Sequence, residues 1–395
     1  MAPARKIRVA LIGLNAPFAG TPTGTNWAAA GHLPYLTSSD RYELVALQNS
    51  SAERASKAIE AYGLDPNTVK AYGTPQDIAA DPDVDLVVSC IRVDRHLDSL
   101  LPAIKAGKDV FVEWPVEANL AKVRELAALA KAHGSRNVVG LQGRYNPLAR
   151  KLREIIARGD IGQLESSTVV GQAYGGASLP APIDYFANRK IGGSLHTIIF
   201  SHSMEFIMEV LGDISHHRSF LVNQHPTVSI IDPITHQVVD KARPNDSPTH
   251  IVLNAMLSSG TALTYTLRGD NASSPTIKAP AGGKPRMPTL DWRIFGTTGQ
   301  IRVTSYDDMV NTWSLNRDAD HLKVEVYNAQ TDTLTELDVV EDDFEKLPET
   351  ARNMARLYEA FASARAGDDV WYPDFDYGVK KHQLIDAMYK ENDME

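Results

Sequence analysis

The first 142 residues alternate between short apolar runs and segments with helical signals, and this alternation constrains the fold more than any other feature. The predicted strands lie at residues 7–13, 42–48, 69–72, 85–90, 109–113 and 137–142. The predicted helices lie at residues 26–36, 51–62, 96–106 and 120–133. Strands and helices that alternate at this spacing indicate a doubly wound parallel sheet. Such a sheet binds ligands beyond the carboxyl ends of its strands.

The pattern changes after residue 143, where strand follows strand. Two pairs of alternating runs are each joined by a short polar, Gly-containing turn, at 258–260 and at 296–299, and each pair predicts a β-hairpin. Amphipathic helices are predicted at 352–365 and 378–389. A second domain rich in β-structure therefore follows the first.

Composition narrows the functional classes. The net charge of −9 argues against a nucleic-acid or anionic-membrane surface as the main partner. No apolar run approaches the roughly 18 residues that a membrane span needs. Cys90 is the only cysteine, which excludes an intrachain disulfide and a cysteine-built zinc site. We expect a cytoplasmic protein.

The turn after the first strand resembles a dinucleotide phosphate loop with one change. Dinucleotide-binding domains use Gly-x-Gly-x-x-Gly, because the glycines let the backbone approach a pyrophosphate. Here Gly13 is followed by Asn15 and Ala16, and the next glycine is Gly20. Asn tolerates the left-handed backbone region better than most residues. An ordinary strand-to-helix turn remains the alternative.

The end of the second strand should meet the adenine ribose, where an acidic residue would favour NAD. The chain instead has Asn49 and Ser50, with Arg54 and Lys57 on the following helix. This arrangement favours NADP, whereas the alternative is that Arg54 and Lys57 form a solvated helix face. The cofactor is therefore predicted as NAD or NADP.

Several linked motifs resemble the glucose–fructose oxidoreductase/inositol dehydrogenase/MocA (Gfo/Idh/MocA) family. The first motif is residues 91–96, ending at His96, and the second is residues 109–115, which contain Glu113-Trp114-Pro115. The third is residues 141–164, and the fourth is Gly192-Gly193 together with His202. The Trp after Glu113 and the Leu-Gln-Gly-Arg string at 141–144 are typical of the branch of the yeast galactose-regulon repressor.

The resemblance implies an α/β fold in which an N-terminal Rossmann domain precedes an α+β domain with a large, open, mostly antiparallel sheet. The expected domains are 1–142 for NAD(P), 143–374 for substrate and dimerisation, and 375–395 as a C-terminal helix that returns to the first domain. The sheet is expected to form a homodimer. The cofactor-binding residues that follow from the strand ends and the resemblance are Gly13, Asn15, Ala16, Asn49, Ser50, Arg54, Ile91, His96, Glu113, Trp114 and Gln142.

The chain departs from the family at its chemistry. Dehydrogenases of the family use a Lys after the Glu and an Asp one turn before the His; here these positions are Trp114 and Ile198, and only His202 remains. An indole cannot act as an acid or base. Candidates for a rebuilt acid–base set, besides His202, are Tyr145, Tyr174, Tyr185 and Lys190, for which packing or solvent exposure is the alternative. His196 and His202 lack the further ligands that a metal site needs.

Three functions fit these residues. The leading hypothesis is an NAD(P)-dependent oxidoreductase that acts on a small carbonyl, alcohol or sugar-like substrate with a non-standard acid–base set. The second is an NAD(P)-binding transcriptional regulator like the galactose-regulon repressor, without turnover. The third uses bound NAD without net redox change, for elimination, epimerisation or glycoside cleavage.

Overall fold

The computed structural model describes residues 5–17, 26–270, 287–307, 310–311, 315–316, 320–338 and 342–394. Contacts divide the chain into two compact units. Unit 1 comprises residues 1–141, 190–192 and 346–384, and unit 2 comprises residues 142–189, 193–345 and 385–395.

Unit 1 contains a parallel sheet whose described strands run in the order β3-β2-β1-β4-β5-β6. They are β1 (Ile7–Ile12), β2 (Tyr42–Gln48), β3 (Lys70–Tyr72), β4 (Leu86–Ser89), β5 (Asp109–Glu113) and β6 (Asn137–Gly140). The order reverses between β1 and β4, as in Rossmann domains, and this is where such sheets bind ligands. The predicted N-terminal fold is confirmed.

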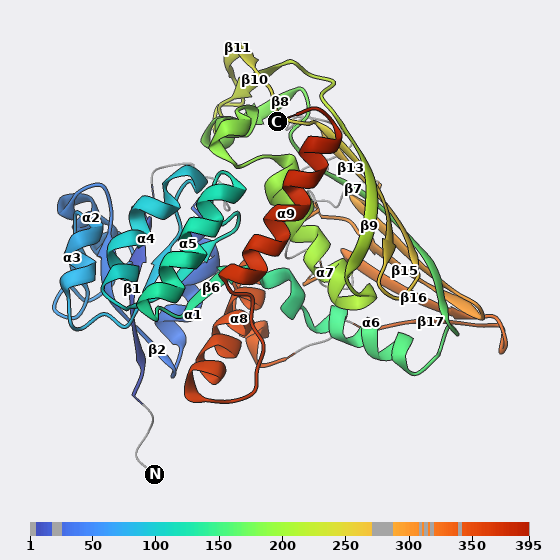
Figure 1. Ribbon diagram of the computed structural model, residues 1–395, viewed down its shortest axis with the longest axis horizontal. Coiled ribbons are helices and arrows are strands. Elements are labelled where there is room, and N and C mark those ends of the chain that lie inside the picture. The colour runs from blue at the N-terminus through green and yellow to red at the C-terminus, as the bar shows by residue number, and fades with distance from the viewer. Residues whose placement is uncertain are drawn as a thin grey trace. The chain divides into compact units, whose positions relative to one another are not determined.

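The helices that connect the strands of this sheet lie against it (Figure 1). They are α1 (Leu33–Ser38), which a short π-helical turn η1 (Ala28–His32) precedes, α2 (Ala52–Ala61), α3 (Pro75–Ala80), α4 (His96–Lys105) and α5 (Leu120–His133). Ser51 caps α2 as predicted, because its side chain accepts a hydrogen bond from the backbone of Arg54. Helix α3 was not expected; Thr74 and Asp77 form a capping box that starts it.

Helix α8 (Glu349–Ala366) lies in unit 1, whereas its residues were expected in the second domain. The cause is an aromatic contact that sequence periodicity does not reveal. Tyr358 is fully buried against Phe111 of β5, and its carbonyl accepts a hydrogen bond from the hydroxyl of Tyr42 at 2.6 Å. Part of α9 (Phe375–Glu391), up to Leu384, also belongs to unit 1.

Unit 2 is built on a large sheet whose described strands run in the order β17-β16-β15-β14-β7-β13-β12-β9. They are β7 (Leu164–Tyr174), β9 (Ile214–Val222), β12 (His250–Leu257), β13 (Ala262–Asp270), β14 (Leu290–Gly296), β15 (Gly299–Ser305), β16 (Leu322–Asn328) and β17 (Thr333–Glu336). All neighbours pair antiparallel except β13 and β7. Both predicted hairpins, β12–β13 and β14–β15, are confirmed. A separate small sheet, which was not expected, contains β8 (Ser178–Pro180), β10 (Thr227–Ile231) and β11 (Val238–Pro244).

Helices α6 (Pro147–Ala157) and α7 (Ser201–Leu211) lie on one side of the large sheet (Figure 1). Alternate sheet side chains point to α7 and are buried with it. Tyr265 bonds Ser203 through the two hydroxyls at 2.7 Å, and Phe206 packs on Trp292 with ring centroids 5.8 Å apart. This contact fixes which face of the sheet is the core and which is left outward.

Candidate functional site

The turn after β1 requires glycine at its first position. Gly13 has a φ of +97°, and a Cβ there would lie 2.2 Å from the carbonyl oxygen of Cys90. The side-chain amide of Asn15 lies 3.3 Å from the carbonyl oxygen of Gly13. The backbone carbonyl of Asn15 accepts hydrogen bonds from the side chains of Asn26 and Tyr62. Asn15 is exposed, which leaves this turn open at the carboxyl end of the strand. Ala16 is half-buried, and residues 18–25, including Gly20, lie outside the described part of the chain.

The end of β2 lies beside this turn. Asn49 is buried and donates a hydrogen bond from its side chain to the carbonyl of Leu14 at 2.8 Å. Ser50 is exposed, and Arg54 is exposed in the first turn of α2. The guanidinium of Arg54 makes no ion pair within the described residues, whereas Lys57 pairs with Glu53 at 2.7 Å. Arg54 therefore remains available for an anion.

His96 begins α4 and is fully buried. Its Nδ1 lies 3.1 Å from the carbonyl oxygens of Pro115 and Val116, and its Nε2 lies 3.1 Å from that of Ile91. Burial lowers the pKa of His96, against the effect of these hydrogen bonds. The imidazole thus ties the loop after β4 to the loop after β5. Because both ring nitrogens face protein carbonyls, His96 supports the strand ends, and the cofactor contact expected for it stays a prediction.

Glu113 ends β5 inside a buried hydrogen-bonded chain. His32 lies between Glu113 and Tyr358: its Nε2 is 2.8 Å from the Glu113 carboxylate, and its Nδ1 is 2.7 Å from the Tyr358 hydroxyl. On the other side, a Cβ on Gly140 would lie 2.8 Å from the same carboxylate. Glu113 is therefore engaged by the protein, and its carboxylate holds β5, β6 and the residues around η1 in place.

Trp114 follows Glu113 and is only 4% exposed. Its indole packs on the imidazole of His382 from α9, with ring centroids 4.6 Å apart. Sequence reasoning missed His32, Tyr358 and His382, because their partners are far away in the chain. The prediction of a C-terminal helix that returns to the first domain was the one signal that pointed toward His382.

In unit 1 the structure therefore brings the ends of β1, β2, β4 and β5 to one edge of the sheet. The cofactor-binding residues predicted from these strand ends, with the exception of Gln142, all lie in unit 1. Gln142 is buried and opens the short helical turn η3 (Gln142–Tyr145), which belongs to unit 2. The glycine turn, the open position of Asn15 and the exposed Arg54 fit a phosphate-bearing dinucleotide.

In unit 2 the helix that carries His202 begins at Ser194. The side chains and backbones of Ser194 and Thr197 form a capping box, and the first turns, η6 (Leu195–Phe200), are π-helical before α7 begins. His202 is 8% exposed. A Cβ on Gly143 would lie 3.1 Å from the His202 carbonyl, so η3 runs directly against this part of α7.

Charged side chains surround this contact. The Nε of Arg144 lies 3.2 Å from Glu209 and 3.9 Å from Glu205, which is fully buried. Tyr145, next to Arg144, is half-buried on the same turn. The structure thus brings the η3 segment with Tyr145 beside the part of α7 that carries His202.

The other predicted residues gather elsewhere on unit 2. Tyr174 ends β7, and the following Gly175 lies against Leu195 at the start of η6. Tyr185 lies in η4 (Ala181–Ala187), and a Cβ on Gly193 would lie 2.6 Å from its ring. Both tyrosines are half-buried.

Lys190 is exposed in η5 (Arg189–Ile191) and groups with unit 1 rather than with these residues. Ile198 is half-buried in η6, close to Gly193. Its aliphatic side chain supplies no acid or base there.

His196 has a packing environment distinct from that of His202. It is fully buried, its Nε2 lies 3.5 Å from the Met388 sulfur, and its ring meets Tyr389 edge-on at 4.8 Å. Burial lowers the pKa of His196 to about 3. Among the described residues, no group of three or more His, Cys, Asp or Glu side chains is placed to hold a metal ion.

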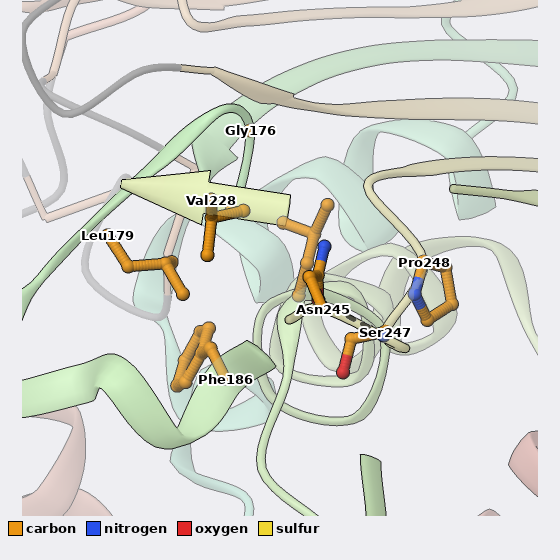
Figure 2. Close-up of a pocket in the computed structure, with 9 residues that line it drawn as sticks. Gly176, Leu179, Phe186, Val228, Asn245, Ser247 and Pro248 are labelled. Carbon is orange, nitrogen blue, oxygen red and sulfur yellow. Dashed lines mark hydrogen bonds between the residues drawn. The ribbon is translucent and has the colours of Figure 1, made fainter. Parts of the chain in front are cut away.

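A small recess in unit 2 lies between the small sheet and η4 (Figure 2). It is lined mainly by apolar side chains, among them Leu179, Phe186 and Val228, with Asn245 and Ser247 on one side. None of the predicted site residues lines it. In the described part of the chain, no helix is long and apolar enough to cross a membrane.

Comparison with known proteins places both parts of the chain. Residues 21–141 match the model of the oxidoreductase family with an NAD-binding Rossmann fold. Residues 147–305 match the model of the Gal80p C-terminal domain.

Relatives of both functional kinds are found. Dehydrogenase aclE of Aspergillus oryzae is 27% identical over 78% of this chain and 79% of its own length. The galactose/lactose metabolism regulatory protein GAL80 of Saccharomyces cerevisiae is 26% identical over 76% of this chain and 67% of its own length.

Solved structures share the fold over nearly the whole chain. A super-repressor mutant of Gal80p from Saccharomyces cerevisiae has a TM-score of 0.81 at 21% identity and covers 99% of this chain and 97% of its own. An NAD-binding oxidoreductase from Klebsiella pneumoniae has a TM-score of 0.70 at 19% identity and covers 98% of this chain and 97% of its own. The chain therefore combines an N-terminal Rossmann domain that belongs to the Gfo/Idh/MocA family with a second domain that belongs to the Gal80 type.

Proposed function

We propose that the protein is an NAD(P)-dependent oxidoreductase that acts on a small carbonyl, alcohol or sugar-like substrate with a non-standard acid–base set. The observation that carries this proposal is His202. It is retained on a capped helix and is nearly buried, and its backbone lies against Gly143 of η3, next to Arg144. A polar, partly enclosed histidine of this kind is suited to proton transfer. A cytoplasmic location suits such an enzyme.

The strand ends of unit 1 would hold the dinucleotide. When bound, NAD(P) supplies or accepts the hydride. Backbone groups of Gly13, Asn15 and Ala16 would face the pyrophosphate, because the glycine turn leaves room for it. Asn49, Ser50 and Arg54 would meet the adenine ribose, and Ile91 and Trp114 would border the nicotinamide end.

The proton must come from residues other than Trp114 and Ile198. His202 is our first candidate. Tyr145 lies on the turn that packs against the same stretch of α7 and is the second. Tyr174, Tyr185 and Lys190 are further candidates, of which the two tyrosines lie around the start of η6.

The decisive experiment is to test His202→Gln against a panel of sugars, polyols, ketones and alcohols, with nicotinamide absorbance as the readout. We expect kcat to fall by about 100-fold or more, since general acid–base groups typically contribute 10²–10⁴-fold. The dissociation constant for the dinucleotide should stay unchanged. The matched control is His133→Gln, because His133 is exposed at the end of α5. Binding of dinucleotide without turnover of any panel member by the wild type would refute the enzyme proposal.

For the cofactor we propose NADP over NAD. The carrying observation is the exposed guanidinium of Arg54, which pairs with no acid among the residues that the structure describes, near a strand end without an acidic residue. Arg54→Ala should weaken NADPH binding by about 10-fold and leave NADH binding unchanged, because only NADPH carries the 2′-phosphate. Lys57→Ala is the control, since Glu53 already neutralises that lysine. Equal losses for both dinucleotides in Arg54→Ala would contradict the preference.

We also propose a homodimer through the outward face of the large sheet. The exposed side chains of Phe220 and Val170 lie in one row across it, because Phe220 pairs with Val252, Val252 with Thr266, and Thr266 with Val170. Val170→Lys should then give monomers in analytical ultracentrifugation. Val238→Lys, at a residue of similar exposure on the small sheet, should not. A monomeric wild type would refute this proposal.

A regulator without turnover is the second candidate, and the buried indole of Trp114 favours it. This side chain occupies the family's lysine position and cannot transfer a proton. Under this alternative the wild type binds NAD(P)H with no turnover, and His202→Gln changes nothing that is measured. The substrate panel above therefore separates the two functions.

A further inference from the structure

His382 is a buried histidine that the proposed function leaves unexplained. It lies on α9 and is only 4% exposed. Its ring packs on Trp114 at 4.6 Å, and its Nε2 is buried without a hydrogen-bond partner in the described part of the chain. The other buried histidines of unit 1 differ, because both nitrogens of His32 and both of His96 have partners.

The approach of α9 to the sheet explains how His382 reaches this position. The carbonyl of Pro373 accepts a hydrogen bond from Val139 of β6 at 2.8 Å, and Asn137 accepts one from the backbone of Phe375. At Gly378 the helix passes so close that a Cβ would lie 2.9 Å from Val116. One helical turn after Gly378, at i+4, comes His382.

An imidazole nitrogen that is buried without a partner lowers the stability of the fold. A leucine would fill a similar volume at no such cost. The polar group lies beside Trp114, directly after the last residue of β5, and therefore at the sheet edge where dinucleotides bind. A bound ligand would supply the missing partner.

We propose that His382 binds the carboxamide of the nicotinamide ring through Nε2. The inference rests on the proposed function, since it assumes that unit 1 holds NAD(P). His382 and Trp114 belong to the same unit as Gly13 and Asn49, so the dinucleotide is the ligand that this unit can hold with its own residues. A carboxamide offers both a donor and an acceptor, and either tautomer of a neutral imidazole can pair with it.

The electrostatic setting agrees with a neutral partner. Burial lowers the pKa of His382 to about 3. The ring is therefore uncharged at neutral pH, and it would bind a neutral amide rather than a phosphate or carboxylate. Such a residue positions the ring and does not itself exchange a proton with the substrate.

The test compares His382→Leu and His382→Gln with the wild type. The dissociation constants of NADH and of ADP-ribose are measured by calorimetry. ADP-ribose is the informative probe, because it carries the adenosine and pyrophosphate but no nicotinamide. We expect His382→Leu to weaken NADH about 10-fold and to leave ADP-ribose unchanged, which is the loss of one hydrogen bond. His382→Gln, which keeps an amide at this depth, should recover most of the affinity.

Thermal unfolding without ligand gives an independent readout. If His382 is kept for a ligand, the melting temperature of His382→Leu equals or exceeds that of the wild type. His196→Leu is the matched control, since His196 is equally buried in unit 2, and it should leave NADH affinity unchanged. Unchanged NADH affinity in His382→Leu, or an equal loss for NADH and ADP-ribose, would overturn the assignment. A wild type that binds none of NADH, NADPH and ADP-ribose would instead refute the proposed function.

Discussion

The buried chain Tyr358–His32–Glu113 makes the sharpest prediction about stability. His32 bridges two side chains that are far from it in the sequence: Tyr358 is 326 residues away and Glu113 is 81 residues away. The substitution His32→Leu keeps a side chain of similar size against Phe111 and Tyr358. It removes both hydrogen bonds at once and leaves a buried carboxylate and a buried hydroxyl unpartnered.

The expected loss follows from these two groups. A buried hydroxyl without a partner costs about 1–2 kcal/mol, and a carboxylate that loses a charge-assisted bond costs about 2–3 kcal/mol. The sum is about 3–5 kcal/mol. In a domain of this size 1 kcal/mol corresponds to about 2–4 °C, so the melting temperature should fall by roughly 6–20 °C.

Calorimetry of the ligand-free protein at pH 7 measures this fall. The comparison variant is Tyr358→Phe, which removes only the hydroxyl–imidazole bond and should cost about 1–2 kcal/mol. The reasoning predicts an order in which His32→Leu is clearly worse than Tyr358→Phe. If the two variants unfold at the same temperature, the His32–Glu113 hydrogen bond does not contribute to stability. The hydrogen-bonded series Tyr358–His32–Glu113 would then not hold β5 in position.

Two further predictions concern backbone and pH. Gly13→Ala should lower the free energy of unfolding by at least about 2 kcal/mol and abolish dinucleotide binding, because it combines a positive φ with a clash against Cys90. The control Gly63→Ala, also at a positive φ but with open space around it, should lower it by only about 1 kcal/mol. Equal unfolding temperatures of the two variants would contradict the clash. Because the folded-state pKa of His196 lies near 3 and the unfolded value near 6.5, the unfolded chain takes up a proton first as the pH falls. Stability is then lost from about pH 6.5 downward, by about 2 kcal/mol at pH 5. Denaturant titrations at pH 7 and pH 5 measure this loss of unfolding free energy. The loss should be smaller in His196→Leu and unchanged in His133→Leu, because His133 is exposed. Equal losses in the two variants would refute the assignment of the pH dependence to His196.

The order of elements in unit 1 could be predicted because each has a local signal. Continuous apolar runs mark strands that are buried on both faces. Caps such as Ser51 and stops such as Gly134 mark helix ends. Parallel topology then follows from the alternation itself. Helix α3 was not predicted because it is only six residues long, which is too short for a helical period to be visible in the sequence.

Contacts between distant segments could not be predicted. Periodicity shows that α8 has an apolar face but does not show which sheet that face contacts. In the structure Tyr358 of α8 packs on Phe111 of β5, and both residues belong to unit 1. The strands β9 and β11 lie in polar stretches, where exposed residues break the alternation. Strand β10, which pairs with β11, is only five residues long. Their pairing depends on neighbours from elsewhere in the chain.

The candidate site divides in the same way. Gly13 could be identified because a left-handed glycine at the end of a first strand has a local reason. The roles of Glu113 and His96 could not, since their partners are His32 and three carbonyls from separate loops. Their side chains hold the strand ends, and the cofactor contacts expected for both residues stay predictions.

The side-chain contacts that hold the strand ends are relevant to the function of the protein. The residues that shape the dinucleotide edge are all present: the glycine turn, the buried chain behind β5 and the histidine that joins the two loops. Trp114 and Ile198, at the two positions where the resemblance implies a lysine and an aspartate, supply no acid or base. A buried chain of polar groups is costly unless every member is satisfied, so its presence indicates that the geometry of this edge is needed. A bound dinucleotide is therefore common to both proposed functions, and turnover by His202 is the property that separates them.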